Sequence, residues 1–372
     1  MRSGKIFSAF FAAAFAAGLL FFPAAAVQGA ARGLDYCLII LVPSLFPFMA
    51  LAAYLVKSGL SDSMGRLLSP LTMLLFRLPG CTAATILMSM IGGFPVGARG
   101  IAALHQQGSI TDEQAGRMAS FCVNAGPAFV LSVVGVGLLG NISAGIVLLS
   151  AQLLASLILG VLLGRRAKAG TVQSNLAKTK KSAAPLIDST IDAAKGTMYL
   201  CAFVILFSVI LFLLREVGFS TLLARMFLRL GFSPAVCGAA LSVLLEVTGA
   251  CLDIAILGGS GALFAFAMGW GGVCVHFQVL SSLTKIPFSR PMFFLHQFLK
   301  GILSAVIAVV LFQIFPQTAP VFSNTAQSFT GKLSGNPAAA TALVFLCIVL
   351  LCSVGAEKLE FRKKSCYTKS KV

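Results

Sequence analysis

Uninterrupted apolar stretches constrain the fold of this chain more than any other feature of its sequence. Residues 142–163 and 338–354 carry no charged side chain at all. A helix needs about 20 apolar residues to cross the hydrocarbon core of a bilayer, and both stretches are near that length. Similar stretches recur at 6–27, 34–56, 196–214 and 291–315. The pattern predicts an all-α protein that crosses the membrane several times.

The composition agrees with a membrane protein and argues against a nucleic-acid partner. Only 10% of the residues are charged, against about 25% in soluble domains. The net charge of +17 is not spread over the chain, because the basic residues collect at 165–181 and in the tail 357–372. Basic blocks beside apolar spans are typical of cytoplasmic loops. We therefore expect an integral membrane protein with a lipid bilayer as partner and no nucleic acid.

The sequence carries no pattern of a known catalytic or metal site. Its ten cysteines lie mostly inside apolar runs without a CxxC pair, so packing explains them better than disulfides or metal binding. There is no nucleotide-binding loop and no Ser-His-Asp order. We predict a protein that is not an enzyme, has no cofactor, and draws any energy from a gradient or a partner chain.

The N-terminal residues 1–33 allow two interpretations. Ala24-Ala-Ala26 would suit cleavage of a signal peptide, but the apolar run 6–27 exceeds the roughly 7–15 residues of a signal peptide's apolar region. We therefore favour a retained N-terminal transmembrane helix.

Glycine and proline interrupt four further apolar segments, at 81–106, 111–136, 234–257 and 261–283. The interruptions read Gly92-Gly-Phe-Pro95-Val-Gly97, Asn124-Ala-Gly126-Pro127, Glu246-Val-Thr248-Gly249 and Gly269-Trp-Gly271-Gly272. Proline removes a helical hydrogen bond, and glycine lets the backbone leave helical geometry. Unwound backbone at membrane depth persists only where protein or a water-filled cavity satisfies it. Four such breaks therefore indicate a cavity inside the bilayer.

The order of these segments repeats. Each half begins with a span and an amphipathic helix, which follows Gly59 in the first half and Gly218 in the second. A helix of small residues, a break, a second broken helix and a final span come next in both halves. We therefore expect two repeats and four further regions. These regions are repeat one at 34–164, a basic cytoplasmic linker at 165–194, repeat two at 195–315, an extracytoplasmic loop at 316–337, a C-terminal transmembrane helix at 338–356 and a basic cytoplasmic tail at 357–372.

The distribution of charge predicts how the repeats are oriented. If 81–106 and 234–257 are re-entrant hairpins rather than crossings, both termini and the basic linker fall on the cytoplasmic side. The two repeats are then inverted, which is the architecture of many secondary transporters. Arg215, Arg225 and Arg229 fall outside in this arrangement, against the charge rule.

Several motifs in this order resemble the sporulation integral membrane proteins of the YlbJ type. They are Gly93-Phe-Pro95-Val-Gly97, Ser120-Phe-Cys-Val-Asn124-Ala-Gly126-Pro127, Leu245-Glu246-Val-Thr248-Gly249 and Gly271-Gly272-Val-Cys-Val-His276-Phe-Gln278. The resemblance, which runs from about 34 to 315, implies two nucleoside recognition or gate-type domains and a core like that of concentrative nucleoside transporters. It also implies a location in a bacterial cell membrane and transport of dipicolinic acid from the mother cell across the outer forespore membrane. Phe94 stands where many relatives have tyrosine.

The breaks supply the candidate residues for binding a solute or a coupling ion. They are Gly93, Phe94, Pro95, Gly97, Arg99, Asn124, Gly126, Pro127, Glu246, Thr248, Gly249, Gly271, Gly272, His276 and Gln278.

Two charged candidates each have a functional and a structural interpretation. Arg99 would bind a carboxylate of the solute bidentately, or it extends from a hairpin mouth into water. Glu246 would carry a proton or bind a coupling sodium ion, or it pairs with an arginine.

The neutral candidates have similar alternatives. His276 would relay protons, or it bonds to a carbonyl. Asn124, Thr248 and Gln278 would place polar contacts on a solute, or they bond helix to helix. Half-helix N-termini after Gly97 and Pro127 would attract a carboxylate.

Three functions stay open from the sequence. The first is a secondary transporter of a small anion such as dipicolinate. The second is a transporter of nucleosides or other small metabolites. The third is a sporulation membrane partner that transports nothing. The sequence does not decide whether the protein is a monomer or an oligomer.

Overall fold

The computed structural model describes residues 2–167 and 183–316. The predicted extracytoplasmic loop beyond 316, the C-terminal helix 338–356, the tail and most of the basic linker lie outside these residues. In the first half the helices are α1 (Arg2–Phe21), α2 (Pro23–Asp35), η1 (Tyr36–Leu41), α3 (Val42–Lys57), α4 (Leu60–Phe76), α5 (Thr82–Gly92), α6 (Phe94–Gln106), α7 (Asp112–Phe121), η2 (Ala128–Leu138) and α8 (Ile142–Arg166).

In the second half the helices are α9 (Pro185–Glu216), α10 (Phe219–Arg229), α11 (Pro234–Leu245), α12 (Val247–Ile256), α13 (Gly261–Trp270), α14 (Gly272–Ser282) and α15 (Arg290–Ile314). The described residues contain helices and no strands. Five helical stretches are long and apolar enough to cross a membrane, namely Pro23–Lys57, Ile142–Arg166, Pro185–Glu216, Gly261–Ser282 and Arg290–Ile314. The predicted all-α polytopic membrane protein is confirmed.

The N-terminal helices are divided differently from the expectation. The helix break lies at Phe22, whose backbone leaves helical geometry (φ −125°, ψ 56°), and α2 begins directly at Pro23. Proline favours this position, because the first N–H groups of a helix lack partners and the proline ring fixes φ at a helical value. From Pro23 the chain stays helical through the π-helical turn η1 to Lys57.

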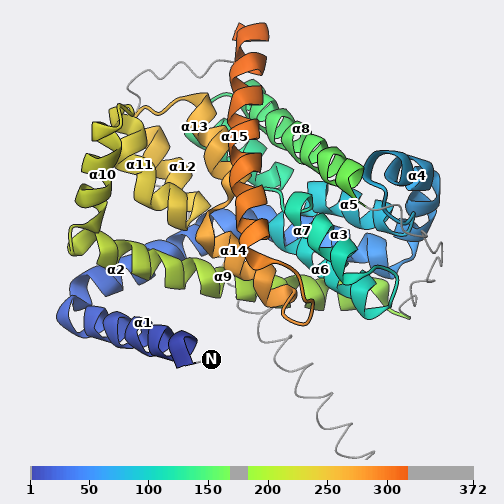
Figure 1. Ribbon diagram of the computed structural model, residues 1–372, viewed down its shortest axis with the longest axis horizontal. Helices are drawn as coiled ribbons and strands as arrows, with labels where there is room; N and C mark the ends of the chain where they lie inside the picture. The colour runs from blue at the N-terminus through green and yellow to red at the C-terminus, as the bar shows by residue number, and fades with distance from the viewer. Residues whose placement is uncertain (1, 168–182, 317–372) are drawn as a thin grey trace, which may run out of the picture. The chain divides into compact units, whose positions relative to one another are not determined.

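This long helix, α2–η1–α3, packs antiparallel to α9 (Figure 1). Gly29 and Gly33, spaced by one helical turn, lie directly against the backbone of Val209 and Ile205. Small residues at this spacing let two membrane helices approach closely. At the other end, the Lys57 ammonium donates to the carbonyl oxygen of Asp188 at 3.0 Å. The first helices of the two predicted repeats therefore run in opposite directions.

The first predicted re-entrant segment forms a helical hairpin, which we call hairpin one (α5 and α6). Gly97 packs on Ser89, and Gly100 packs on Thr85, so the arms are antiparallel. The Cys81 thiol lies 3.9 Å from the carbonyl oxygen of Ser109. The open ends of the two arms are therefore neighbours, as a re-entrant segment requires.

The corresponding segment of the second half forms hairpin two (α11 and α12). Gly238 near the start of α11 packs on Leu257, just after the end of α12. Further in, the Ser242 hydroxyl bonds to the Asp253 carboxylate. In Figure 1, hairpin two lies to the left of α15 and hairpin one to its right.

The two hairpins open toward opposite ends of the described helices. Near the open end of hairpin one, Arg117 donates to the carbonyl oxygen of Phe76 at 3.2 Å and Gly116 packs on Phe288. Near the open end of hairpin two, Gly261 packs on Phe312. The inverted repeat itself stays a prediction, and these contacts are consistent with it.

Candidate functional site

The two helix breaks of the first half contact each other at glycine residues. Gly93, which separates α5 from α6, has φ 81° and ψ −176°, a conformation that only glycine adopts readily. A Cβ atom on Gly93 would lie 3.3 Å from the backbone nitrogen of Gly126, and one on Gly97 would lie 1.9 Å from the carbonyl oxygen of Cys122. The tip of hairpin one therefore rests directly on the unwound backbone between α7 and η2.

The breaks of the second half cross in the same way. A Cβ atom on Gly272 would lie 2.9 Å from backbone atoms of Leu245 and Glu246, at the tip of hairpin two. The neighbouring Gly271, with φ 81°, approaches the ring of Phe94 from hairpin one; a Cβ there would lie 3.4 Å from the ring. All four breaks therefore meet in one region.

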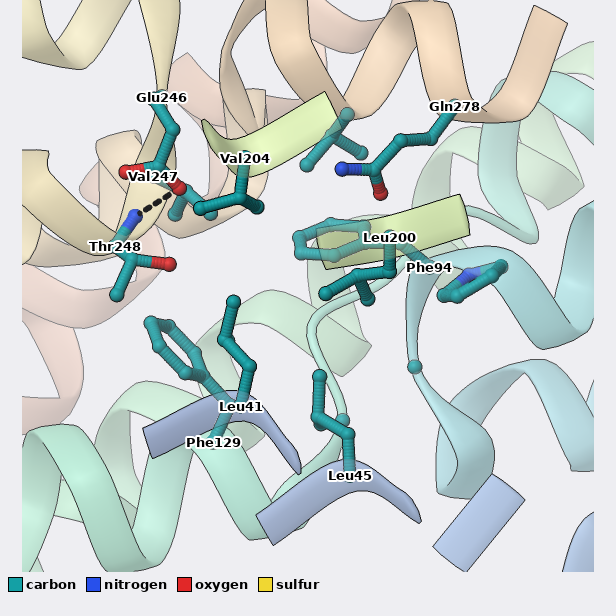
Figure 2. A pocket seen from close by; sticks show the side chains of 14 residues that line it. Leu41, Leu45, Phe94, Phe129, Leu200, Val204, Glu246, Val247, Thr248 and Gln278 are labelled. Atoms are coloured by element: carbon teal, nitrogen blue, oxygen red, sulfur yellow. Dashed lines mark hydrogen bonds between the residues drawn. The ribbon is translucent and has the colours of Figure 1, made fainter. Parts of the chain in front are cut away.

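A pocket opens where the breaks meet (Figure 2). Its empty volume is about 410 Å³ when the space at its mouth is included. The scaffold helices supply leucine and valine side chains to the walls, and the breaks supply backbone and polar groups. The lining residues are Leu41, Leu45, Gly93, Phe94, Pro95, Gly126, Phe129, Leu200, Val204, Glu246, Val247, Thr248, Val275 and Gln278.

Glu246 brings the pocket its carboxylate. Its side chain is 2% exposed, and it accepts the backbone N–H groups of Thr248 at 2.8 Å and Gly249 at 2.6 Å. The carboxylate therefore caps the N-terminus of α12, where the helix dipole favours negative charge. In the described part of the chain, this carboxylate bonds to backbone N–H groups and not to an arginine.

Helix N-termini converge on the same space. α6 begins at Phe94, η2 at Ala128 and α12 at Val247, and residues at or beside each of these starts line the pocket. The positive end of a helix dipole and its free N–H groups attract anions. α6 begins before Gly97, earlier than expected, because Gly93 is the residue that leaves helical geometry. Glu246 already caps the N-terminus of α12, whereas no side chain of the described residues caps the starts of α6 and η2.

The structure brings about half of the predicted site residues to the pocket. Those that line it are Gly93, Phe94, Pro95, Gly126, Glu246, Thr248 and Gln278. Gly97, Gly271 and Gly272 form the crossings beside it. Gly249 holds the Glu246 carboxylate, and Pro127 precedes the first residue of η2.

Arg99 and Asn124 have their contacts elsewhere. The Arg99 guanidinium donates to the carbonyl oxygen of Asp192 at 3.1 Å and packs on Gly196 of α9, so it ties hairpin one to the scaffold. The Asn124 amide donates to the Phe121 carbonyl at 3.0 Å and accepts from the Ser156 hydroxyl.

His276 is buried behind the pocket rather than in its lining. Its Nε2 lies 2.8 Å from the carbonyl oxygen of Trp270, the last residue of α13. The ring packs edge-on against Trp270 and Phe294. Through this contact the imidazole satisfies backbone that the break at Gly271 exposes.

Sequence reasoning missed a group of buried polar side chains on α8 and α15. Gln152, Gln297 and Lys300 are each fully buried, and all three donate to carbonyl oxygens at the break after α7. A signal was present, because Lys300 is the only lysine, arginine, aspartate or glutamate in the predicted span 291–315. An ionisable residue within a membrane span is by default a functional hypothesis.

The helices and the pocket together define a polytopic all-α membrane protein with paired broken helices around a central cavity. The chain is 29% identical over 321 residues to the sporulation integral membrane protein YlbJ of Bacillus subtilis (strain 168), covering 78% of this chain and 78% of that protein. This similarity supports a YlbJ-type protein, as the motifs predicted. No family model matches the chain, and no solved structure matches it.

Proposed function

We propose that this protein is a secondary transporter of a small anionic metabolite, with dipicolinate as the solute. The observation that carries the proposal is the meeting of four helix breaks, two from each half, around one pocket. Discontinuous helices from two repeats surround the solute in many secondary transporters. Their unwound backbone offers dipoles to a solute without the cost of burying further charged side chains.

The chemistry of the pocket suits a small aromatic anion. Leu41, Leu45 and Val204 give apolar walls, and Phe94 and Phe129 bring aromatic rings. Apolar walls with a few placed polar groups are typical of small-molecule sites. The starts of α6 and η2 would attract a carboxylate, and Thr248 and Gln278 would fix its orientation.

Glu246 is the residue that we assign to coupling. An anionic solute placed beside a buried carboxylate suffers strong repulsion, because charges interact far more strongly away from bulk water. Protonation of Glu246 removes that repulsion. The solute and one proton would therefore bind together and move together.

The biological setting follows from the similarity. The relative's name places that protein in sporulation, and we propose the same setting for this chain. The motifs further imply movement of the solute from the mother cell across the outer forespore membrane, with both termini in the cytoplasm.

The test is flux of radiolabelled dipicolinate into proteoliposomes that hold the full-length protein, with and without an imposed pH gradient. The wild type should accumulate dipicolinate and respond to the gradient. Glu246→Gln should lose the response to the gradient, because the amide cannot release a proton. Glu216→Gln, at an exposed glutamate on the last residue of α9, is the control and should behave as the wild type.

Two results would reject the proposal. Uptake of nucleosides but not of dipicolinate would show that the solute is a nucleoside. Absence of any solute flux under every gradient, from a protein that is folded and inserted, would favour a membrane partner that transports nothing.

A further inference from the structure

Lys300 is a fully buried lysine at the centre of the membrane helix α15. Its ammonium donates to the carbonyl oxygen of Val123, in residues 122–127 between α7 and η2, which we call the unwound segment. Among the described residues, no carboxylate forms an ion pair with it. Burial of an unpaired ammonium is costly, so the surrounding backbone must supply the compensation.

The compensation comes from the carbonyl groups at the end of α7 and in the unwound segment that follows it. The last carbonyl groups of a helix lack partners and carry partial negative charge. Here side chains satisfy them one after another. Gln297 donates to the carbonyl oxygens of Ala119 and Ser120 at 3.1 and 3.2 Å, and Gln152 donates to that of Ala125 at 3.0 Å.

Lys300 is the charged member of this set. Half-helix C-termini and unwound carbonyl groups are the ligands that hold sodium ions in secondary transporters. Two buried oxygen atoms without a hydrogen-bond partner belong to the same glutamines, namely Oε1 of Gln152 and Oε1 of Gln297. A third, Oγ of Ser304, lies about one helical turn beyond Lys300 on α15. Gln297, Lys300 and Ser304 lie on one face of α15 by their spacing. A region rich in oxygen ligands therefore contains a protein ammonium.

We propose that Lys300 is a built-in cation that replaces a bound alkali-metal ion at the unwound segment. In the wild type the ammonium supplies the positive charge, so the break needs no sodium or potassium. Removing the amino group leaves Val123 O and the spare oxygen atoms as an empty cation site. This proposal does not depend on the transport of any solute.

The test measures the thermal unfolding midpoint, Tm, of purified full-length protein in detergent with choline, sodium, potassium or n-propylammonium chloride at equal ionic strength. The wild type should give the same Tm with each cation. Lys300→Ala should lose several degrees in choline and recover part of the loss, in a saturable way, in sodium or propylammonium. Propylammonium matches the part of the lysine side chain that alanine lacks.

Two variants separate charge from packing. Lys300→Met keeps most of the apolar stem and should respond to sodium only. Lys285→Ala removes an exposed lysine in the loop after α14 and should match the wild type with every cation. If Lys300→Ala yields no folded protein, propylammonium present during extraction should restore a monodisperse species.

The proposal is overturned if Lys300→Ala and Lys300→Met lose stability equally with all cations. It is also overturned if both variants are as stable as the wild type in choline, since the charge would then be unnecessary. If Lys300→Ala is unfolded and propylammonium does not restore its folding, the proposal is likewise overturned. None of these results depends on whether dipicolinate moves across the membrane.

Discussion

At the scale of single residues, the missing side chain of glycine lets the helix breaks pack directly on each other. Gly97 of hairpin one meets the carbonyl oxygen of Cys122, a backbone atom that cannot rotate away. Gly100, one turn further along α6, meets the methyl group of Thr85, which a side-chain rotation can move. The two positions share a helix and a residue type but differ in what an added methyl group would strike.

We therefore expect Gly97→Ala to cost more stability than Gly100→Ala. Overpacking against a fixed backbone typically costs about 1–3 kcal/mol, and alanine favours a helix interior by about 1 kcal/mol relative to glycine. Gly97→Ala should lower Tm, whereas Gly100→Ala should change it little. Equal Tm values for the two variants would show that the crossing at Cys122 is not tight.

Arg99 is a second residue whose contacts differ from the prediction. An arginine in an apolar segment is a reasonable candidate for a solute carboxylate, yet its guanidinium donates to Asp192 of α9. Arg99→Lys keeps the charge and a donor, so it should reduce Tm modestly and leave the affinity for dipicolinate unchanged. A competition assay in which Arg99→Lys weakens dipicolinate binding at least tenfold would instead place this side chain at the solute.

At the scale of elements, polar contacts hold hairpin two to the scaffold. Arg215 of α9 donates to the hydroxyl of Ser242 at 2.8 Å and to the carboxylate of Asp253. Because these two residues lie on different arms, one guanidinium fixes both arms at once. Arg215, which contradicted the charge rule in the sequence, therefore has a partner in the structure.

A double-mutant cycle tests this clamp. We expect Arg215→Ala and Asp253→Ala to be coupled by about 1 kcal/mol in the free energy of unfolding, since partly exposed pairs contribute modestly. The pair His105 and Asp112, of which Asp112 is 51% exposed, is the control and should couple more weakly. Additive effects of the Arg215 and Asp253 substitutions would mean that the clamp contributes nothing.

At the scale of the whole described chain, one end of the helices carries a group of basic residues, while Arg215, Arg225 and Arg229 lie toward the other end. Lys57, Arg77 and Arg165 lie at helix ends, and Lys57 and Arg77 donate to the start of α9 and the end of α8. Arg117 of α7 donates to the carbonyl oxygens of Phe76 and Arg77. Basic residues favour the cytoplasmic side, so this end is predicted to face the cytoplasm. The opposite end carries the clamp at Arg215.

Cysteine labelling tests this orientation. Gln107 is exposed at the basic end and Glu216 at the opposite end. We expect a membrane-impermeant maleimide to label Glu216→Cys, but not Gln107→Cys, from outside intact cells. The unsubstituted protein gives the background from its native thiols. Labelling of both cysteines from the same side would contradict the inverted arrangement.

The sequence by itself determined the fold class and the positions of the breaks. Charge-free stretches force membrane-spanning helices, because an unpaired backbone cannot cross hydrocarbon. The breaks at Gly93, at 122–127, at Glu246 and at Gly271 were predicted, since glycine and proline act locally. The local rule places Gly93, Pro95 and Gly126 at breaks, and Phe94, Glu246 and Thr248 were predicted because they lie in or beside those breaks.

Only the tertiary structure decided which groups meet. Lys300 and Val123 are far apart in the sequence, as are Gly93 and Gly126, and no local pattern states their distance. The direction of Arg99 toward α9 and the pairing of Arg215 with Asp253 likewise depend on how the helices pack. Helix formation is set by neighbouring residues, whereas a pocket is set by contacts between distant ones, and these contacts exist only once the helices are placed.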